Sequence, residues 1–438
     1  MLLGYLLRHL VRHGTLVVID HRGTPHRFSG EPGPTVTMRL HHPALERRLF
    51  FNPRMALGEA FMDGTLTIED ASVYDFLHFM VSNINAAPRN ALTPLYFGFG
   101  KAFRAFQQYN PLHRARRNVA HHYDLSDTLY DLFLDADRQY SCAYFTEPDQ
   151  TIEQAQANKK RHIAAKLLLT PGQKVLDIGS GWGGLALYLA KECGVSVTGL
   201  TLSTEQRRVA ERRAAAAGLA DRVRFELCDY REATGRYDRI VSIGMFEHVG
   251  VVHYPEFFRR LHELLSDDGV ALLHSIGRKD GPATTNPWLR KYIFPGGYSP
   301  ALSEVVPVVE RLGLWITDIE ILRLHYAETL RAWRTRFNAN RERIRALYDE
   351  RFCRMWEFYL AGAEIAFRID GHMNFQMQLA KKVDTVPLVR DYMVDWERRH
   401  RPPAPERAAR WQLEPGPARP RPAAQPAPQE EEPREVSR

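Results

Sequence analysis

One short stretch combines the residue types that a nucleotide-binding site requires. The apolar run 175–178 contains Asp177 and ends in a turn with glycines at 179, 181, 183 and 184, after which leucines recur at 185, 187 and 189. This order predicts a strand, a tight loop and a helix. Because glycine has no Cβ, such a loop brings the backbone amides of a helix N-terminus close to a ligand. The stretch therefore predicts a nucleotide-like cofactor site, in preference to a turn that only packs a helix against a strand.

Two cofactor classes fit this loop. Its glycines satisfy G-x-G-x-x-G, but a dinucleotide fold also places an acid about 20 residues further on, at the end of the second strand, to hold the ribose hydroxyls. Here the second strand, 195–202, ends without an acid and runs into 203–206, where Gln206 could do that polar work. Asp177 instead precedes the loop. These residues favour S-adenosylmethionine over NAD.

Acidic and imidazole side chains accompany the later predicted strands in the same way. Asp229, Glu247 and His274 follow or close the predicted strands 223–227, 239–244 and 270–276. The carboxyl ends of parallel strands share one edge of a sheet, so we expect these side chains to gather there with Asp177. A carboxylate in such a cleft could accept a proton or orient a group that does. Purely structural roles also stay open at this point: Glu247 could cap the next helix, and His274 could be a core residue.

Strand and helix patterns alternate through the middle of the chain. Helices are expected at 152–169, 204–217 and 255–265, and a mostly helical insertion at 330–367. Repeated strand–helix units force a parallel, doubly wound sheet, so the fold class is α/β. Apolar and amide side chains alternate at 373–379, which predicts a last strand that could run antiparallel.

The first hundred residues predict a small separate α/β module. Strands are expected at 16–19 and 35–40, and helices at 58–64 and 73–80. Residues 1–122 hold 14 Lys/Arg and 8 Asp/Glu, so six of the seven excess positive charges of the chain lie there. Phe99, Phe103 and Phe106 follow at helical spacing beside Lys101 and Arg104. Such a module suits an acidic partner, either nucleic acid or an anionic membrane surface, although a basic balance without consequence is also open.

Length and composition limit the remaining possibilities. The chain of 438 residues is long enough for two domains. Its four cysteines are widely spaced, with no metal-ligand grouping, which predicts a reduced, cytosolic setting. No apolar run has the length of a membrane span, so we expect a soluble protein. From Pro402 onward the sequence is rich in Pro, Ala, Arg and Glu, which predicts a disordered tail.

Several longer stretches resemble one known family. They are similar to those of the cyclopropane-fatty-acyl-phospholipid synthases and the related mycolic acid methyltransferases, strongly over residues 115–395 and more loosely before them: 122–124 (HYD), 140–145 (YSCAYF), 176–183 (LDIGSGWG), 201–206 (TLSTEQ), 238–250 (DRIVSIGMFEHVG), 274–277 (HSIG) and 325–326 (HY). The resemblance implies a Rossmann-like class I S-adenosylmethionine methyltransferase fold. It also implies an N-terminal lipid-binding domain at 1–112, a catalytic domain at 113–400 and a tail at 401–438.

The resemblance further implies a reaction and a partner. The enzyme would add a methylene across cis double bonds of phospholipid acyl chains, by methyl transfer, a carbocation and proton loss to bound bicarbonate. The alternative is a fatty-acyl methyltransferase that leaves a methyl or methylene branch; a methyltransferase for a small soluble acceptor and a lipid-binding protein without activity are more distant. The expected setting is cytoplasmic, peripherally on the inner face of the membrane, without nucleic acid and with a homodimer possible.

The site residues are carried over from the same resemblance. The bicarbonate would be held by Cys142, Glu247, His274, the backbone of Ile276, and Tyr326. The carbocation could be stabilised by the aromatic faces of Tyr140, Tyr144 or Phe246. The cofactor would be bound by Tyr140, Ser141, Val175, Asp177, Gly179, Ser180, Gly181, Gly183, Thr201, Leu202, Gln206, Asp229 and Tyr230. Two positions depart from many relatives, which carry Cys where this chain has Ala363 and Ser180.

Overall fold

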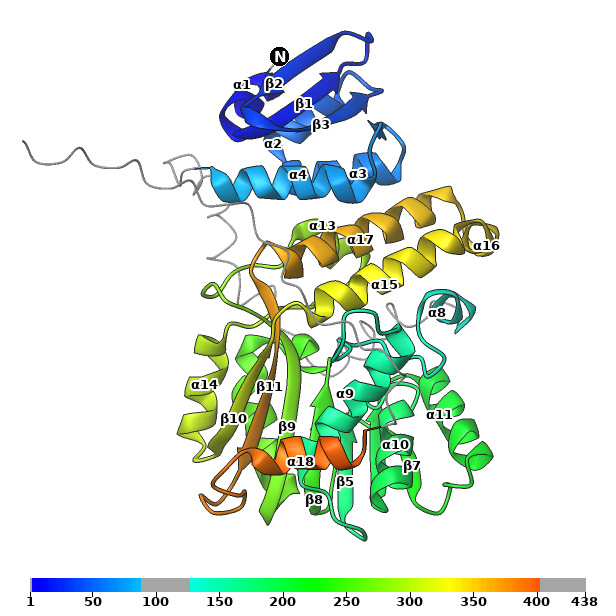
Figure 1. The fold of residues 1–438 in the computed structure, drawn as a ribbon, viewed down its shortest axis with the longest axis vertical. Helices are drawn as coiled ribbons and strands as arrows, with labels where there is room; N and C mark the ends of the chain where they lie inside the picture. Colours follow the sequence, from blue (N-terminus) through cyan, green and yellow to red (C-terminus); the bar gives the residue numbers. More distant parts are fainter. Residues whose placement is uncertain (1, 88–126, 402–438) are drawn as a thin grey trace, which may run out of the picture.

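Residues 2–87 and 127–401 are described by the computed structural model, and they form two sheets with a layer of helices between them (Figure 1). The smaller sheet belongs to the N-terminal module. Its elements are α1 (Leu2–Leu10), β1 (His13–Ile19), β2 (Pro25–Ser29), β3 (Glu31–Leu40), α2 (Leu45–Phe51), α3 (Pro53–Met62), β4 (Leu66–Glu69) and α4 (Val73–Ala86). The strand order is β2-β1-β3-β4, with β1 and β3 parallel and the other neighbours antiparallel. Alternate residues of β1 and β3, such as Leu16 and Val36, are buried in the core of this module.

The larger sheet carries the glycine loop. Its strands are β5 (Lys174–Ile178), β6 (Ser196–Thr201), β7 (Val223–Leu227), β8 (Tyr237–Ile243), β9 (Leu265–Arg278), β10 (Trp315–Leu322) and β11 (His372–Ala380), in the order β10-β11-β9-β8-β5-β6-β7. Strand β11 is antiparallel to both of its neighbours, and the other neighbouring pairs are parallel. The chain order reverses at β5, so the crevice beyond the carboxyl end of that strand is the expected place for a ligand.

Helices cover both faces of this sheet. One face buries apolar side chains of α9 (Ile152–Leu167), α10 (Gly184–Cys193) and α11 (Thr204–Ala216). The other face buries those of α12 (Tyr254–Leu264) and α14 (Leu302–Arg311). Two short 3-10 helices, η1 (Phe246–His248) and η2 (Val251–His253), connect β8 to α12, and α18 (Asp391–Arg399) packs on α9. This doubly wound arrangement places all the loops that follow the parallel strands at one edge.

A helical layer lies between that edge and the N-terminal module (Figure 1). It consists of α13 (Pro287–Tyr292), α15 (His325–Ala339), α16 (Arg341–Leu347) and α17 (Glu350–Arg368), with α8 (Asp127–Phe133) beneath α15. The module docks on it through close contacts. Trp288 covers Gly58, where an added Cβ would come within 2.5 Å of the indole, and its Nε1 donates to the Met62 sulfur at 3.1 Å. The hydroxyl of Tyr292 donates to Glu59 at 2.8 Å.

Most of the predicted elements are confirmed, with ends shifted by a few residues. The strands expected at 16–19, 35–40, 175–178, 195–202, 223–227, 239–244, 270–276 and 373–379 correspond to β1, β3, β5, β6, β7, β8, β9 and β11. Among the described α-helices and strands, eight had not been predicted: α1, α2, α13, α14, α18, β2, β4 and β10. The antiparallel direction of the last strand is confirmed. Its amide-bearing face is buried like its apolar face, which alternation alone does not reveal.

Some expectations fall outside the described residues. These are the aromatic stripe at 99–106, the domain boundary at residue 112 and the tail beyond 401. Within the described ranges, no helix combines the length and apolar character needed to cross a membrane.

Candidate cofactor pocket and active site

The glycine loop after β5 takes a backbone path that a side chain would obstruct. Gly179 has a φ of 89°, and a Cβ there would lie 2.9 Å from the Cβ of Met245. The amides of Gly179 and Ser180 donate to the carbonyl of Leu200 at 3.0 and 2.8 Å, which fixes the loop to the end of β6. Gly181 also has positive φ, and an added Cβ there would meet open space. The loop is therefore held open beside a cavity.

A pocket opens at this edge of the sheet. It is lined by Arg138, Gln139, Tyr140 and Ser141, by residues 177–182, Gly184 and Leu185 of the glycine loop, by Leu200, Thr201, Leu202 and Gln206 after β6, by 228–231 after β7, and by Ile243, Gly244, Met245, His248 and Val249 after β8. Eleven of the thirteen residues expected to bind the cofactor line it. Val175 and Gly183 do not: Val175 is a residue of β5 whose side chain is buried in the core, and Gly183 packs against the ring of Phe225.

The pocket contains one buried carboxylate with an unused oxygen. Asp177 is 1% exposed, and its Oδ2 has no hydrogen-bond partner among the described residues. Burial raises the pKa of this carboxyl to about 7, and the nearby Lys159 lowers it in part. A buried acceptor without a partner costs free energy unless a ligand satisfies it. Asp177 is thus placed to accept a hydrogen bond from a ligand group.

The other polar residues of the pocket are held in pairs. The Thr201 hydroxyl donates to Gln206 Oε1 at 2.9 Å, so the glutamine is oriented by the strand that precedes it. Asp229 accepts two hydrogen bonds from the guanidinium of Arg231, both at 2.8 Å. These contacts preorganise the acceptor groups at the ends of β6 and β7.

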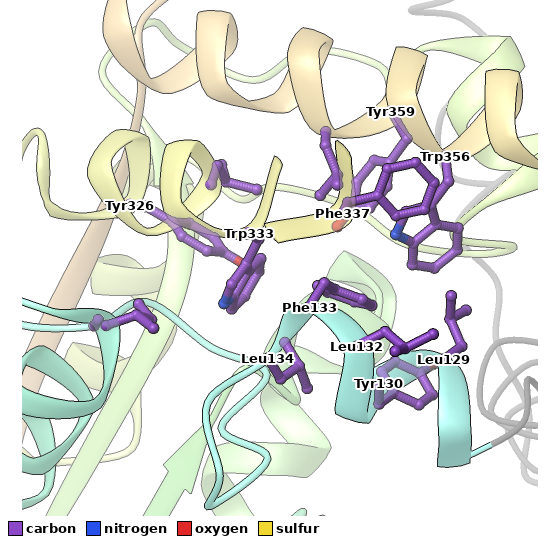
Figure 2. Packing of buried hydrophobic residues seen from close by; sticks show 14 of the residues in the cluster. Leu129, Tyr130, Leu132, Phe133, Leu134, Tyr326, Trp333, Phe337, Trp356 and Tyr359 are labelled. Atoms are coloured by element: carbon purple, nitrogen blue, oxygen red, sulfur yellow. The ribbon is translucent and has the colours of Figure 1, made fainter. Parts of the chain in front are cut away.

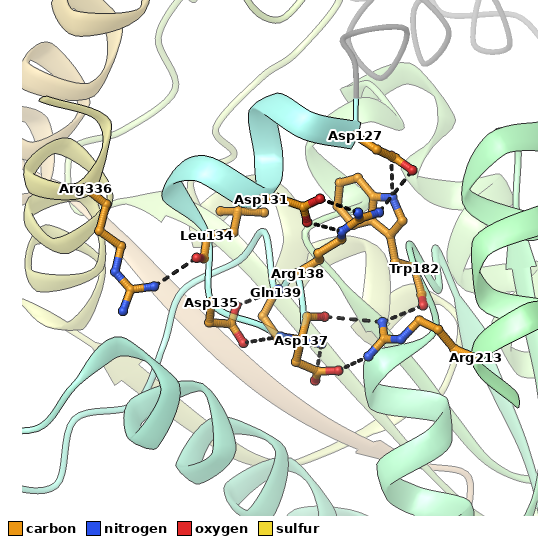
Figure 3. Close-up of polar contacts among 10 residues, drawn as sticks. All are labelled: Asp127, Asp131, Leu134, Asp135, Asp137, Arg138, Gln139, Trp182, Arg213 and Arg336. Atoms are coloured by element: carbon orange, nitrogen blue, oxygen red, sulfur yellow. Dashed lines mark hydrogen bonds and ion pairs between the residues drawn. The ribbon is translucent and has the colours of Figure 1, made fainter. Parts of the chain in front are cut away.

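A short segment before α9 covers the pocket, and ionic contacts of Arg138, Arg213 and Lys160 fix it; Figure 3 shows those of the two arginines. Arg138, which has a φ of 53°, binds Asp131 through two nitrogens at 2.6 and 2.7 Å and Asp127 at 3.0 Å. Arg213 of α11 contacts the Asp137 carboxylate and donates to the carbonyl of Trp182 at 2.8 Å. The cover is therefore tied both to α8 and to the glycine loop itself.

The carboxylate expected to serve as a base lies beside the end of β9. Glu247, in η1, is 8% exposed, and its Oε1 accepts a hydrogen bond from the amide of Ile276 at 2.6 Å. Its Oε2 is buried and has no hydrogen-bond partner in the described part of the chain. Burial raises the pKa of this carboxyl to about 7, against the opposing effect of the Ile276 amide. The structure thus brings Glu247 and Ile276 into contact and leaves one carboxylate oxygen available.

His274 is buried between two amides of the neighbouring strand. Gln376 Nε2 lies 3.1 Å from its Nδ1, and Asn374 Nδ2 lies 3.3 Å from its Nε2. Burial lowers the pKa of the imidazole to about 3, so the ring is neutral. A neutral ring has one N–H, so one of the two amides must present its oxygen to the ring. Neither amide oxygen has another partner among the described residues. The two amides therefore fix the plane of the ring.

Cys142 and Tyr326 belong to an aromatic cluster under the helical layer, into which Ile276 also packs. Figure 2 shows its rings on α15 and α17 facing those of α8. Cys142 is 1% exposed, and burial raises the pKa of its thiol, so it is neutral. The residue after it, Ala143, donates its amide to Thr329 of α15 at 3.0 Å. Cys142 is therefore a buried thiol beside the helix that begins with His325 and Tyr326.

The three aromatic residues expected to face a carbocation have different surroundings. Tyr140 lines the pocket, stacks on Trp333 at 5.1 Å and shares a hydrogen bond with the Tyr359 hydroxyl at 2.9 Å. Tyr144 lies between the rings of His162 and His325, outside the residues that line the pocket. Phe246 is buried among the aromatic residues of α12. Of these three, Tyr140 is the ring that faces the cavity.

Residues 111–377 match the family described as mycolic acid cyclopropane synthetase, over more than half of the chain. The chain belongs to this family. A cyclopropane-fatty-acyl-phospholipid synthase of Escherichia coli (strain K12) is 36% identical over 349 residues, which cover 79% of this chain and 88% of that protein. A probable fatty acid methyltransferase of Pseudomonas putida is 36% identical over 365 residues, covering 81% of this chain and 89% of that protein.

Solved structures agree with this assignment. The mycolic acid cyclopropane synthase CmaA1, complexed with SAH and CTAB, is 35% identical, with a TM-score of 0.57 over 60% of this chain and 97% of that one. The large sheet is thus the class I methyltransferase fold, and this member of the cyclopropane synthetase family is a methyltransferase dependent on S-adenosylmethionine. The pocket suits that cofactor, because the unused oxygen of Asp177 can accept from a cationic ammonium.

One buried helix face had escaped the sequence analysis. On α9, Gln156, Lys159, His162 and Lys166 are all buried. They recur at spacings of three and four among Ala155, Ile163 and Leu167, the spacing of one helix face. The sequence did contain a signal for this buried polar face, namely charged residues at helix positions where apolar residues are expected. The cover residues Arg138 and Gln139 gave no comparable signal, because their role depends on a loop conformation.

Proposed function

We propose that this enzyme adds a methylene group across cis double bonds of phospholipid acyl chains, forming cyclopropane rings. The cofactor supplies an electrophilic methyl group; the alkene provides the electron pair, and one proton must then leave the added methyl for the ring to close. The observation that carries the proposal is the buried Glu247 with one unused oxygen beside the Ile276 amide. An alkene reaction that releases a proton in an apolar cavity needs such an acceptor.

Glu247 suits the removal of that proton. With a pKa near 7 it is partly ionised at neutral pH, which is the range in which a general base works best. The hydrogen bond from Ile276 holds one oxygen and leaves the other directed elsewhere. Glu247 could take the proton itself or share it with a bound anion.

We also propose bicarbonate as that anion, with Cys142, Glu247, His274, Ile276 and Tyr326 around it. The Ile276 amide is engaged by Glu247, so the anion would have to share this donor or displace the carboxylate from it. His274 is neutral and held by Asn374 and Gln376, which leaves it a hydrogen-bonding group without a charge. A protonated Glu247 would avoid repulsion between two anions.

The aromatic cluster supports the formation of a cation. Tyr140 presents a ring to the pocket, and Trp333 and Tyr326 lie behind it, with ring centroids 5.9 Å apart. Aromatic faces attract positive charge, and they also exclude water that would trap a carbocation. Trp333 and Tyr326 belong to α15, so these rings lie where the helical layer meets the cofactor pocket, which suits an acyl chain entering from that layer.

We further propose that the N-terminal module docks on an anionic membrane surface, from the cytoplasmic side. Phe51 at the end of α2 is 69% exposed and adjoins Arg47 and Arg48 in a shallow depression. An exposed aromatic side chain beside cations suits the interface of an anionic bilayer. Phe51→Ala with Arg47→Ala should weaken flotation with anionic vesicles, whereas Val389→Ala, a substitution of a similarly exposed residue on the catalytic part, should not. We propose a homodimer as well, which sedimentation analysis would test.

The alternative product is a methyl or methylene branch. The chain is as similar to a probable fatty acid methyltransferase as it is to the cyclopropane-fatty-acyl-phospholipid synthase, at 36% identity in both cases. This similarity supports the branched product as a second candidate. The two outcomes differ in which proton is lost from the cation.

Mass spectrometry of lipids separates these products. The purified enzyme is incubated with S-adenosylmethionine and vesicles of a cis-monounsaturated phospholipid, and the product is then treated to cleave double bonds. A gain of one CH₂ with resistance to cleavage supports the cyclopropane. The same gain with a cleavable alkene supports the branched product, and no gain contradicts both.

A further inference from the structure

Lys159 is a buried charge at the edge of the cofactor pocket that the reaction above does not use. It lies on α9 and is 1% exposed. Its Nζ donates to Gln139 Oε1 and to Ser141 Oγ, both at 2.7 Å. Both partners line the pocket. The ammonium therefore contacts the pocket wall from behind.

These two hydrogen bonds determine which groups of the pocket wall act as hydrogen-bond donors and which as acceptors. An ammonium group only donates, so the Ser141 oxygen must accept from it, and the serine proton is free to be donated elsewhere. Gln139 must likewise turn its oxygen toward Lys159, and its Nε2 donates to Asp137 at 3.0 Å. Lys159 thus makes Ser141 a hydrogen-bond donor, at a position where it lines the cavity.

The charge of Lys159 is not neutralised by a contact. Within residues 2–87 and 127–401 no carboxylate forms an ion pair with its ammonium within 4.0 Å. The charged and titratable groups that face it more distantly are Asp135 and Asp137 of the cover, Cys142, Lys160 of its own helix, Asp177 of β5 and His274 of β9. A buried cation with only neutral acceptors is costly unless an anion comes near it.

We propose that Lys159 is a positioning residue that, through the Ser141 hydroxyl, makes the pocket recognise a carboxylate-type oxyanion, namely the aminoacyl carboxylate of the cofactor. S-adenosylmethionine and S-adenosylhomocysteine carry this single anionic group. The inference rests on the proposed function, since it concerns the cofactor of that site. Bicarbonate has the same chemistry and is the other possible source of the anion.

Titration of Lys159 supplies a second signature. Burial lowers its pKa to about 8, with Asp135 acting in the opposite direction. An oxyanion that depends on the ammonium should bind less well as the pH rises through this range. The amino group of the ligand titrates as well, so each affinity must be compared with that of Lys159→Met at the same pH.

Ligand pairs test the inference directly. S-adenosylhomocysteine carries the carboxylate, and 5′-methylthioadenosine lacks the whole aminoacyl end. By calorimetry, Lys159→Met should weaken S-adenosylhomocysteine by about tenfold or more, the worth of a charge-assisted hydrogen bond, and should leave 5′-methylthioadenosine within twofold. Lys160→Met is the matched control: it removes the same charge one residue away, from a lysine that contacts Asp137. Arg213 still contacts Asp137 in this variant, so neither affinity should change.

A second variant keeps the test informative if Lys159→Met does not fold. Ser141→Ala should also reduce the preference for S-adenosylhomocysteine, and combining the two changes should add little. If S-adenosylhomocysteine is unaffected but the bicarbonate concentration needed for turnover rises tenfold, the oxyanion is bicarbonate and the role of Lys159 stands.

Other results overturn the inference. Equal weakening of both nucleosides would mean that Lys159 is only structural, and no change in either nucleoside or in bicarbonate dependence would exclude the role altogether. Failure of the unmodified enzyme to bind S-adenosylhomocysteine would instead contradict the proposed function.

Discussion

Two lysines of helix α9 are equally buried but contact different kinds of groups. Lys159 and Lys166 are seven residues apart, on one face of the helix, and each is 1% exposed. Lys166 contacts the carboxylate of Glu320. Lys159 contacts an amide oxygen and a hydroxyl at the wall of the cofactor pocket. The two lysines therefore differ in the groups that their ammonium groups contact and not in how deeply they are buried.

The neighbourhood of Lys166 is a closed ionic network. Glu320 also binds His162 Nε2 at 2.6 Å, and His162 Nδ1 binds Glu397 of α18 at 2.6 Å. Each charge there has an opposite partner, so the network stabilises the attachment of α18 and β10 to α9. Asp177 lines the pocket and Lys159 and Glu247 lie near it, and within residues 2–87 and 127–401 none of the three contacts a group of opposite charge. Incomplete pairing beside a cavity marks a place where a ligand completes the electrostatics.

Glu247→Gln should give the largest effect of these variants, and this effect should be on the rate of the reaction and not on stability or cofactor binding. Turnover of lipid is expected to fall by about 10²–10⁴, the usual contribution of a general base. The amide oxygen can still accept from Ile276, so stability and affinity for S-adenosylhomocysteine should be preserved. Product formation, urea unfolding and calorimetry measure the three quantities. Full activity in this variant would remove Glu247 from the proton transfer.

Glu320→Gln should break the other side of the comparison. It leaves the ammonium of Lys166 buried without a carboxylate, which costs about 3–5 kcal/mol of unfolding free energy. The affinity for S-adenosylhomocysteine should stay unchanged at a temperature where the variant is folded. Urea denaturation measures the loss. The double variant Lys166→Met with Glu320→Leu is the control, because it removes both charges and should recover much of the stability; an undiminished loss would refute the pairing argument.

The pH dependence of stability should also separate the two sides. Burial lowers the pKa of His162, but the hydrogen bonds that the imidazole makes to the Glu320 and Glu397 carboxylates raise it overall. A raised pKa in the folded state means that the stabilisation is complete below about pH 6.5, the unfolded value, and is lost as the pH rises through the folded value. At pH 6, His162→Gln should therefore lower the unfolding free energy by about 1.5–3 kcal/mol.

The same variant should cost less at pH 9. Glu320 keeps its charge over this interval because its pKa is lowered: burial opposes ionisation, and His162 and Lys166 outweigh it. Denaturation at both pH values provides the measurement. A cost that does not depend on pH would mean that His162 does not change its protonation state between pH 6 and pH 9, contrary to this prediction.

The sequence predicts the framework of this comparison better than its chemistry. The glycine loop and the strands of the large sheet follow from periodicity, because a long apolar run or a run of glycines has few alternative uses. Asp177, Asp229, Glu247 and His274 come to one edge because parallel strands leave no other arrangement. Strands β2, β4 and β10 were missed because short or half-exposed strands carry a weak pattern.

The partners of buried charged residues cannot be predicted from the periodicity of the sequence. Lys159 and Lys166 have the same position in the helical repeat, and only their tertiary partners distinguish them. Those partners come from the cover before α9 and from β10, which a single sequence does not bring together. The separation of Tyr140 from Tyr144 has the same origin, since neighbouring residues of one loop face different surroundings.

Tyr392→Phe should give the smallest effect and sharpen the boundary of the ionic network. The Tyr392 hydroxyl lies 2.9 Å from Gln378 Nε2, and Gln378 in turn donates to the carbonyl of Lys166. Removal of the hydroxyl leaves Gln378 bonded to Lys166 and to Thr317, so the loss should be only about 0.5–1.5 kcal/mol, the worth of one neutral hydrogen bond. Urea denaturation would detect it, and turnover should not change. A loss as large as that of Glu320→Gln would show that α18 is held by this hydroxyl and not by the charges of His162 and Glu397, and the contrast between the two lysines would then concern the pocket alone.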